Sequence, residues 1–209
     1  MNRTQKISGI VAVFVVLMGI FLFVPRHTSR GVSSGTIYID TSFDKVRRIL
    51  VLNDSLKEMV ALQHGEVLHN EWETLRLSSD RLLTLDWDID GVGNFVVRTQ
   101  DPNAGELILN FEQKVEVRKD CITSKTRLKK AVGPLQEYDM DLRLSRDGER
   151  TKVKLTVSLR YSRKLPRTHI DYMNDKVQSS ADQGWEKGIN GLVQIIEKNN
   201  RLFTIPIIR

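Results

Sequence analysis

The sequence has few residues that could crosslink or interrupt a fold. Cys121 is the only cysteine, which excludes an internal disulfide and a zinc site built on cysteines. With 5 prolines and 13 glycines in 209 residues, the chain is neither collagen-like nor of low complexity. Hydrophobic residues make up 40%, enough to form a core. We therefore expect one globular domain stabilised by its core alone, because the chain is too short for two large domains.

The short motifs of common catalytic and cofactor sites are also missing. No serine lies in a Gly-x-Ser-x-Gly context. Gly91-Val92-Gly93 lacks the third glycine and the following helix of a dinucleotide site, so we predict a hairpin turn there. His64, Glu66 and His69 are the only metal-like cluster, but their spacing across a loop does not place both histidines on one face. We predict no catalytic residue, no cofactor and no metal.

Positive charge is concentrated at the start of the chain. Arg3, Lys6, Arg26 and Arg30 precede Gly31, and every acidic residue follows it, so these four account for all but +2 of the net charge of +6. Proteins that bind nucleic acid usually carry a strongly basic face. We therefore expect no nucleic-acid partner.

Residues 1–27 have the pattern of a membrane anchor. Ile7 to Val24 contains no charge, and as a helix its 18 residues would extend about 27 Å, enough to cross a bilayer core. Pro25-Arg26-His27 stands where a cleaved signal peptide would have small residues, which favours a retained anchor. Basic residues flank the run on both sides, and we favour an amino terminus inside. This predicts a single-pass membrane protein with its domain on the non-cytoplasmic side.

Three further segments complete the predicted organisation. Residues 28–35 contain three serines and two glycines, which predicts a flexible tether. The folded domain is expected over residues 36–199. The apolar tail 200–209 is expected to pack on that domain, although contact with the membrane or a partner remains an alternative.

The domain begins with a strand and two helices and continues with a run of strands. Thr36 to Asp40 alternates as a strand does, Phe43 to Leu50 has helical spacing, and a second short helix is expected with its apolar stripe at Leu56 to Leu62. Alternation then predicts antiparallel strands at Glu66–Leu77, Arg81–Ile89, Phe95–Gln100, Glu106–Arg118, Cys121–Ala131, Leu135–Leu144 and Thr151–Tyr161.

Three turns set the expected strand register. A turn at Asp147-Gly148 pairs Leu144 with Thr151, Leu142 with Val153, Met140 with Leu155 and Tyr138 with Val157. Turns at Val132-Gly133-Pro134 and at Lys119-Asp120 pair Thr126 with Met140, Ile122 with Leu144 and Phe111 with Leu128. All three keep the apolar residues on one face of a four-stranded meander. On the other face, basic residues oppose acidic ones, which predicts a solvated surface with the pairs Lys129–Glu137, Arg127–Asp139, Lys125–Asp141 and Asp141–Lys154.

A long helix is predicted after Pro166. Thr168 and Asp171 form its capping signal, and it reaches Lys198 or Asn199. Its apolar stripe must cover the apolar face of the sheet. The glycines of this helix, at positions 184, 188 and 191, would thin it where it approaches the sheet or a bound ligand.

Two stretches carry a resemblance to a known superfamily. Asp182 to Leu192 (Asp-Gln-Gly-Trp-Glu-Lys-Gly-Ile-Asn-Gly-Leu) is similar to the final helix of polyketide-cyclase-like and AHA1-like proteins. Ile39 to Val46 is similar to the strand and helix with which those proteins begin. The chain therefore resembles the START-like, or SRPBCC, superfamily. The resemblance implies an α+β helix-grip fold, with a curved antiparallel sheet of about seven or eight strands wrapped around the long C-terminal helix.

The resemblance also implies a cavity that takes an apolar small molecule or a lipid. The residues expected to line it are mostly apolar with a few polar groups, which is typical of ligand pockets: Trp87, Phe95, Phe111, Gln113, Thr126, Tyr138, Met140, Tyr161, Ala181, Trp185 and Gly188. A filled core is the structural alternative. We expect a membrane-tethered, non-enzymatic binding domain; a protein-interaction or chaperone-assisting module is the second hypothesis, and a cyclase-like enzyme using Tyr138 and Tyr161 is the third.

Overall fold

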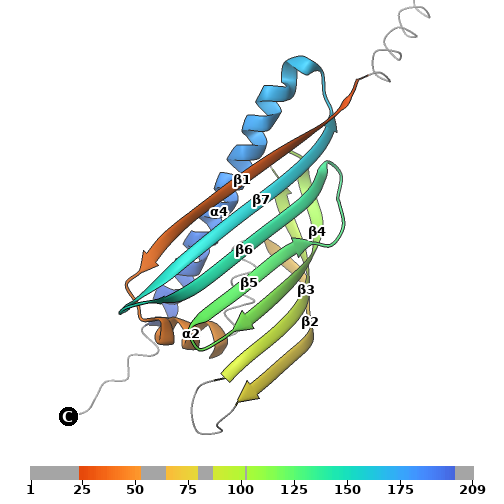
Figure 1. Ribbon diagram of the computed structural model, residues 1–209. Coiled ribbons are helices and arrows are strands. Elements are labelled where there is room, and N and C mark those ends of the chain that lie inside the picture. Colours follow the sequence, from red (N-terminus) through yellow and green to blue (C-terminus); the bar gives the residue numbers. More distant parts are fainter. Residues whose placement is uncertain (1–23, 53–64, 80–86, 102, 201–209) are drawn as a thin grey trace, which may run out of the picture.

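The computed structural model describes residues 24–52, 65–79, 87–101 and 103–200, and these form an antiparallel sheet with helices on its concave side (Figure 1). The sheet has seven strands in the order β1-β7-β6-β5-β4-β3-β2. The elements are β1 (Arg26–Ile39), α2 (Phe43–Leu52), β2 (Glu66–Ser79), β3 (Trp87–Asp101), β4 (Gly105–Val117), β5 (Cys121–Leu128), β6 (Leu135–Asp147), β7 (Arg150–Lys164), the 3-10 helix η1 (Arg167–His169) and α4 (Ile170–Asn200).

The long helix α4 lies against β1 and β7, as Figure 1 shows, and also contacts α2. Between Met173 and Ile196 its predicted apolar stripe is buried, except that Trp185 and Val193 are half-buried. The helix ends at Asn200, close to the predicted end at Lys198 or Asn199. In α2, Phe43, Val46, Ile49 and Leu50 are all buried, as their helical spacing predicts. Together with the inward residues of the strands they form one core. The predicted α+β architecture is confirmed for the described residues.

The first strand is longer than expected, and the predicted tether at 28–35 is wrong. β1 starts at Arg26 and pairs with β7 along its whole length. Its glycines lie where α4 crosses the strand: a Cβ on Gly31 would come 2.4 Å from the carbonyl oxygen of Val177, and one on Gly35 would come 2.6 Å from the ring of Trp185. The small residues therefore allow close helix packing, and their abundance does not indicate flexibility.

The predicted hairpin turn at Gly91-Val92-Gly93 is also wrong. These residues continue β3, which joins the two strands expected on either side of them. Gly93 pairs with Trp72 of β2, and a Cβ there would lie 3.0 Å from Cε3 of Trp72. The missing side chain makes room for the indole, whose edge meets the ring of Phe95. The part of the predicted strand at 81–86 lies outside the described residues.

The strand register is confirmed for two hairpins and shifted in the third. Phe111 pairs with Leu128 and Thr126 with Met140, as predicted. Between β6 and β7, however, the turn is Gly148-Glu149, so Asp147 pairs with Arg150 and the β6 residues from Glu137 onward move two positions along β7: Leu144 with Val153, Leu142 with Leu155, Met140 with Val157 and Tyr138 with Leu159. Side chains alternate with a period of two, so this shift changes the partners and keeps these residues on their predicted faces. Leu135 is the exception, because an irregularity between Leu135 and Glu137 turns it inward.

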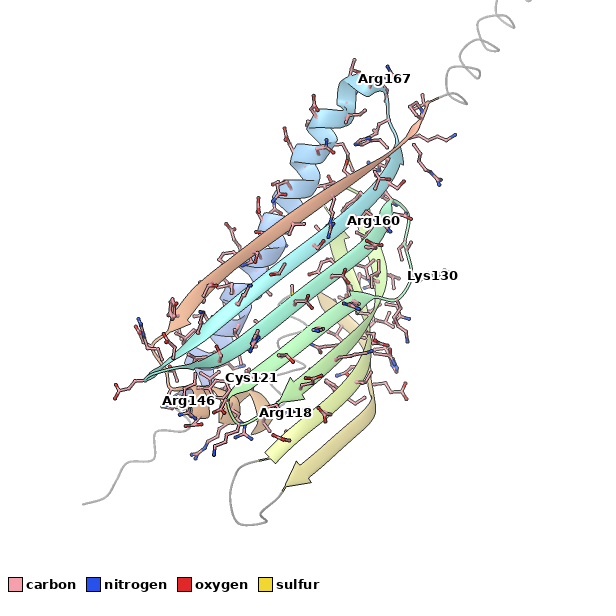
Figure 2. The ribbon with its side chains drawn as sticks, in the orientation of Figure 1. Arg118, Cys121, Lys130, Arg146, Arg160 and Arg167 are labelled. Carbon is pink, nitrogen blue, oxygen red and sulfur yellow. The ribbon has the colours of Figure 1, made fainter. Side chains whose placement is uncertain are left out.

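The outer face of the sheet carries cross-strand charge pairs, partly different from those expected. Arg127 and Asp139 approach to 3.5 Å, as predicted, and Lys125 lies opposite Asp141. Glu137 pairs with Arg160, whose side chain points away from α4 in Figure 2. Two expected pairs are absent here: Lys154 lies opposite Arg143, and Lys129 donates a hydrogen bond to Asn94 at 2.8 Å.

Several predicted elements lie outside the described residues. They are the second short helix, the apolar tail apart from Asn200, which ends α4, and the anchor run Ile7 to Val24 apart from Val24 itself. Among the described helices, none is both long and apolar enough to cross a membrane.

A candidate ligand cavity between the sheet and the long helix

A cavity of about 90 Å³ lies between α4 and the end of the sheet at which β3 ends and β6 begins, and it is partly open to solvent. Strands that are distant in sequence meet there because β3, β4, β6 and β7 run antiparallel around the helix. It is lined by Thr99, Gln100, Asp101, Leu109, Phe111, Leu135, Tyr138, Leu159, Tyr161, Ser180, Gln183, Gly184 and Lys187.

The walls of the cavity are apolar and its rim is polar. Leu109, Phe111, Leu135 and Leu159 are buried on the inner face of the sheet. On the helix side, Ser180, Gln183 and Lys187 form the rim, separated by about one turn each. Gly184 lies among them without a side chain, and a Cβ there would touch Val157 at 3.3 Å. The glycine therefore keeps α4 close to β7 beside an open space.

A buried tyrosine and a carboxylate meet at one side of the cavity. Tyr161 is only 1% exposed, and its hydroxyl donates a hydrogen bond to Oδ2 of Asp101. Burial first, and then the hydrogen bond and charge of Asp101, raise the pKa of Tyr161 well above its ordinary value of 10. The phenol therefore keeps its proton at neutral pH.

The same carboxylate begins a hydrogen-bonded chain that reaches the helix. Oδ1 of Asp101 accepts the backbone N–H of Asn103 at 2.7 Å, and Nδ2 of Asn103 donates to Oγ of Ser180 at 2.9 Å. Oγ of Ser180 in turn donates to the carbonyl oxygen of Lys176 at 2.9 Å. This chain joins β7, the β3–β4 connection and α4 across the cavity. Oδ1 of Asn103 is buried with no hydrogen-bond partner in the described part of the chain.

Tyr138 forms another part of the lining. Its ring meets that of Phe111 edge-on, with centroids 5.3 Å apart. Burial raises the pKa of Tyr138 above its ordinary value. A general acid or base works best with a pKa near the working pH, and both phenols have moved away from neutrality. Neither tyrosine is therefore matched to proton transfer near neutral pH.

The structure brings three of the predicted site residues, Phe111, Tyr138 and Tyr161, to this cavity. Trp185 packs on β1 instead, and its Nε1 donates to the carbonyl oxygen of Leu155 at 3.2 Å. The side chain of Trp87 lies outside the described residues. The remaining six are buried but do not line this cavity: Phe95, Gln113, Thr126, Met140, Ala181 and Gly188. As ligand contacts, all eleven stay predictions.

A second group of inward polar residues lies beside the cavity on β4 and β5. Gln113, Ser124 and Thr126 are all buried; Gln113 and Thr126 are among the residues expected to face inward. Nε2 of Gln113 donates to Oγ of Ser124 at 2.8 Å, whereas Oε1 of Gln113 has no hydrogen-bond partner among the described residues. An unpartnered buried carbonyl destabilises a core and is the kind of group that a ligand donor can satisfy.

The sequence interpretation missed Asp101, Asn103 and the polar rim on α4. One signal was present: Ser180, Gln183, Gly184 and Lys187 repeat at helical spacing beside the buried stripe. Asp101 carries no comparable local signal, because its role depends on Tyr161, which is 60 residues away. Among the described residues no three potential ligands are grouped for a metal; His69 instead lies 3.6 Å from Glu71, and His64 is outside the described residues.

Comparisons with known proteins give likeness in structure only. The chain matches no protein-family model and no curated protein. Among solved structures, it is similar to the Zhui aromatase/cyclase of Streptomyces sp. R1128, with 13% identity, coverage of 84% of this chain and 97% of that one, and a TM-score of 0.48. It is also similar to a START superfamily protein of Mycobacterium smegmatis, with 12% identity, coverage of 80% of this chain and 97% of that one, and a TM-score of 0.44. With the di-domain ARO/CYC StfQ of the steffimycin biosynthetic pathway it shares 8% identity, covering 83% of this chain and 53% of that one, with a TM-score of 0.46. The strand order and the long terminal helix of the described residues fit the helix-grip fold that the sequence predicts.

Proposed function

We propose that this protein binds an apolar small molecule or lipid in the cavity between its sheet and α4, without converting it chemically. The observation that carries the proposal is the division of the lining into buried apolar walls and a polar rim. Ligand sites commonly combine apolar walls with a few polar groups that orient the ligand. Asp101 and Lys187 offer opposite charges for a polar end of the ligand.

The size of the cavity limits how a ligand enters. Its volume of about 90 Å³ is below the 300–1,000 Å³ of sites for drug-sized ligands, and below the ~150 Å³ of a cavity that holds benzene. We therefore propose that one end of the ligand enters first and that the rim opens for the remainder. Gln183 and Lys187 are exposed on α4, so their side chains are free to move aside.

We also propose that Ile7 to Val24 holds the protein in a membrane, with the domain on the non-cytoplasmic side. The run is of bilayer length, and only Pro25 separates it from the first residue of β1. Such an anchor would keep the cavity close to a source of lipid.

Photo-crosslinking tests the binding proposal. The full chain is placed in nanodiscs with a diazirine-bearing palmitate, illuminated, and digested for mass spectrometry. We expect saturable crosslinks in the peptides of β7 and α4 that contain Leu159 and Gly184, and competition by unlabelled palmitate. Gln183→Trp should reduce them by covering the rim, whereas Glu186→Trp, on an exposed α4 residue that does not line the cavity, should not.

The absence of saturable crosslinks in these peptides, or equal loss in both variants, would contradict the proposal. The small volume favours a second candidate in that case: an interaction module with a filled core, which works through its surface. That function predicts protein–protein crosslinks in membranes and no dependence on the rim of the cavity.

A further inference from the structure

One end of the sheet gathers basic residues from both ends of the described chain. The basic end comprises Arg26 and Arg30 on β1, Arg160, Arg163 and Lys164 on β7, and Arg167 on η1. All except Arg163 are exposed, and Arg163 is half-buried. In Figure 2 the labelled Arg160 and Arg167 lie toward the end at which α4 begins, and Arg118 and Arg146 lie toward the other end.

Pairing between β1 and β7 places like charges directly opposite each other. Arg26 lies opposite Lys164, and Arg30 lies opposite Arg160. Between these two pairs, Thr28 lies opposite Ser162. Like charges facing each other across a ladder destabilise a sheet, and hydroxyl groups between them can donate hydrogen bonds to an anion. The arrangement is therefore suited to a bound anionic group.

The carboxylates nearby neutralise only part of this charge. Glu137 pairs with Arg160, and Arg30 lies in the field of Asp139, which Arg127 already pairs. Asp171 and Asp175 stand on the first turns of α4, and neither lies within ion-pair distance of a basic residue that the structure describes. Within the described part of the chain, no carboxylate pairs with four of the basic residues: Arg26, Arg163, Lys164 and Arg167.

We propose that the basic end docks on the phosphate headgroups of an anionic bilayer. The sequence favours a bilayer over an acidic protein or a nucleic acid as the partner. Arg26 follows the uncharged run Ile7 to Val24 after a single proline, so the basic end begins next to the proposed membrane segment. Basic residues next to a membrane segment are attracted to anionic lipid, each contributing about fivefold in affinity. The inference rests on the membrane tether proposed above, and not on the ligand or on the side of the membrane on which the domain lies.

Docking in this way also positions the cavity. Tyr161 and Leu135 line the cavity and pair with each other across β7 and β6. On β7, Tyr161 lies only three residues before Lys164 of the basic end. Asp101, at the end of β3, lies on the same side. A domain held by its basic end therefore keeps the cavity near the headgroup layer, where an apolar ligand leaves or enters the bilayer.

Energy transfer in nanodiscs tests the docking. A donor fluorophore is attached to Thr168→Cys in a Cys121→Ser background, and the acceptor is on lipid headgroups. Thr168 is exposed in η1 beside Arg167. We expect more transfer in discs with phosphatidylglycerol than in discs of phosphatidylcholine alone, and loss of the difference in 1 M salt, where charges are screened within about 3 Å.

Two charge reversals on the outer face provide the variant and its matched control. Arg26→Glu with Lys164→Glu should lower the docked-to-undocked ratio by more than about 25-fold, because loss of each positive charge costs about fivefold and each added carboxylate repels the anionic lipid. Lys152→Glu with Lys154→Glu changes the net charge equally at the other end of β7 and should retain the difference. The anchor run is the same in discs of both lipids. If the proposed anchor did not hold the protein in a membrane, the protein would fail to associate even with neutral discs, and this outcome is distinguishable from a failure of docking.

Equal transfer in both lipids, or equal loss in both double variants, would overturn the proposal. Binding of soluble polyglutamate by the basic end with no response to lipid charge would assign these residues to a protein partner and would overturn it as well. None of these outcomes changes the result of the palmitate crosslinking experiment, which tests ligand binding in the cavity independently.

Discussion

Removing the hydroxyl of Tyr161 is the most informative single change at the cavity. In Tyr161→Phe the ring and its burial remain, and Asp101 loses one of its two described donors and keeps the N–H of Asn103. A hydrogen bond to a charged group contributes roughly 1.5–3 kcal/mol to stability. We therefore expect the free energy of unfolding at pH 7 to fall by about 2 kcal/mol.

The pH dependence of this loss tests whether the folded protein holds the Tyr161 proton, because burial and then the hydrogen bond to Asp101 both raise the pKa of this phenol. The folded-state pKa of Tyr161 is raised, so its stabilisation is fully present below the unfolded pKa of about 10 and is lost as pH rises from there toward the folded pKa. Above pH 10 the wild-type protein should lose about 1.4 kcal/mol per pH unit through this residue. Phenylalanine binds no proton, so the difference between the two proteins should shrink by that amount.

The assay is urea unfolding of the full chain in non-ionic detergent at pH 7 and pH 11, followed by tryptophan fluorescence. Tyr172→Phe is the matched control, because Tyr172 is 59% exposed and contacts Lys176 only through its ring face. Its effect should stay within about 0.5 kcal/mol at both pH values. A penalty for Tyr161→Phe that is as large at pH 11 as at pH 7 would refute the reasoning.

Two further changes test the packing. Gly31→Ala should lower the free energy of unfolding by about 3 kcal/mol in the same assay, because its Cβ would stand 2.4 Å from the carbonyl oxygen of Val177. The control Val32→Ala, on the exposed face, should have little effect. Similar effects of both substitutions would exclude close helix contact as the reason for the glycine. Gln113→Met combined with Ser124→Ala should raise the free energy of unfolding by about 1 kcal/mol, because the pair removes a buried oxygen without a described partner together with both ends of the Gln113–Ser124 hydrogen bond. A loss of stability in that variant would show that the oxygen is satisfied in solution.

Much of the framework follows from local pattern. The spacing from Phe43 to Leu50 and the stripe along α4 each predict one buried face, and the structure buries both. Alternation predicts which side of every strand between Cys121 and Tyr161 faces inward. Among the cavity-wall residues of these strands, Leu135 changes side, because the register shifts between Leu135 and Glu137. A periodic pattern records burial directly, because each position of a helix or strand faces in a known direction.

Other features depend on what lies across from a residue, and periodicity does not record that. The serines and glycines of 28–35 match both a tether and a strand under a crossing helix, and only the approach of Val177 and Trp185 distinguishes them. The predicted β6–β7 register is wrong by two residues, and the alternation could not reveal this error because a shift of two leaves a side chain on the same face. The cavity and the basic end are likewise tertiary: Asp101 meets Tyr161, and Arg26 meets Lys164, because the curved sheet brings distant strands together around α4. The sequence by itself determined the faces, and the packing of the sheet on its helix decided which of those faces meet.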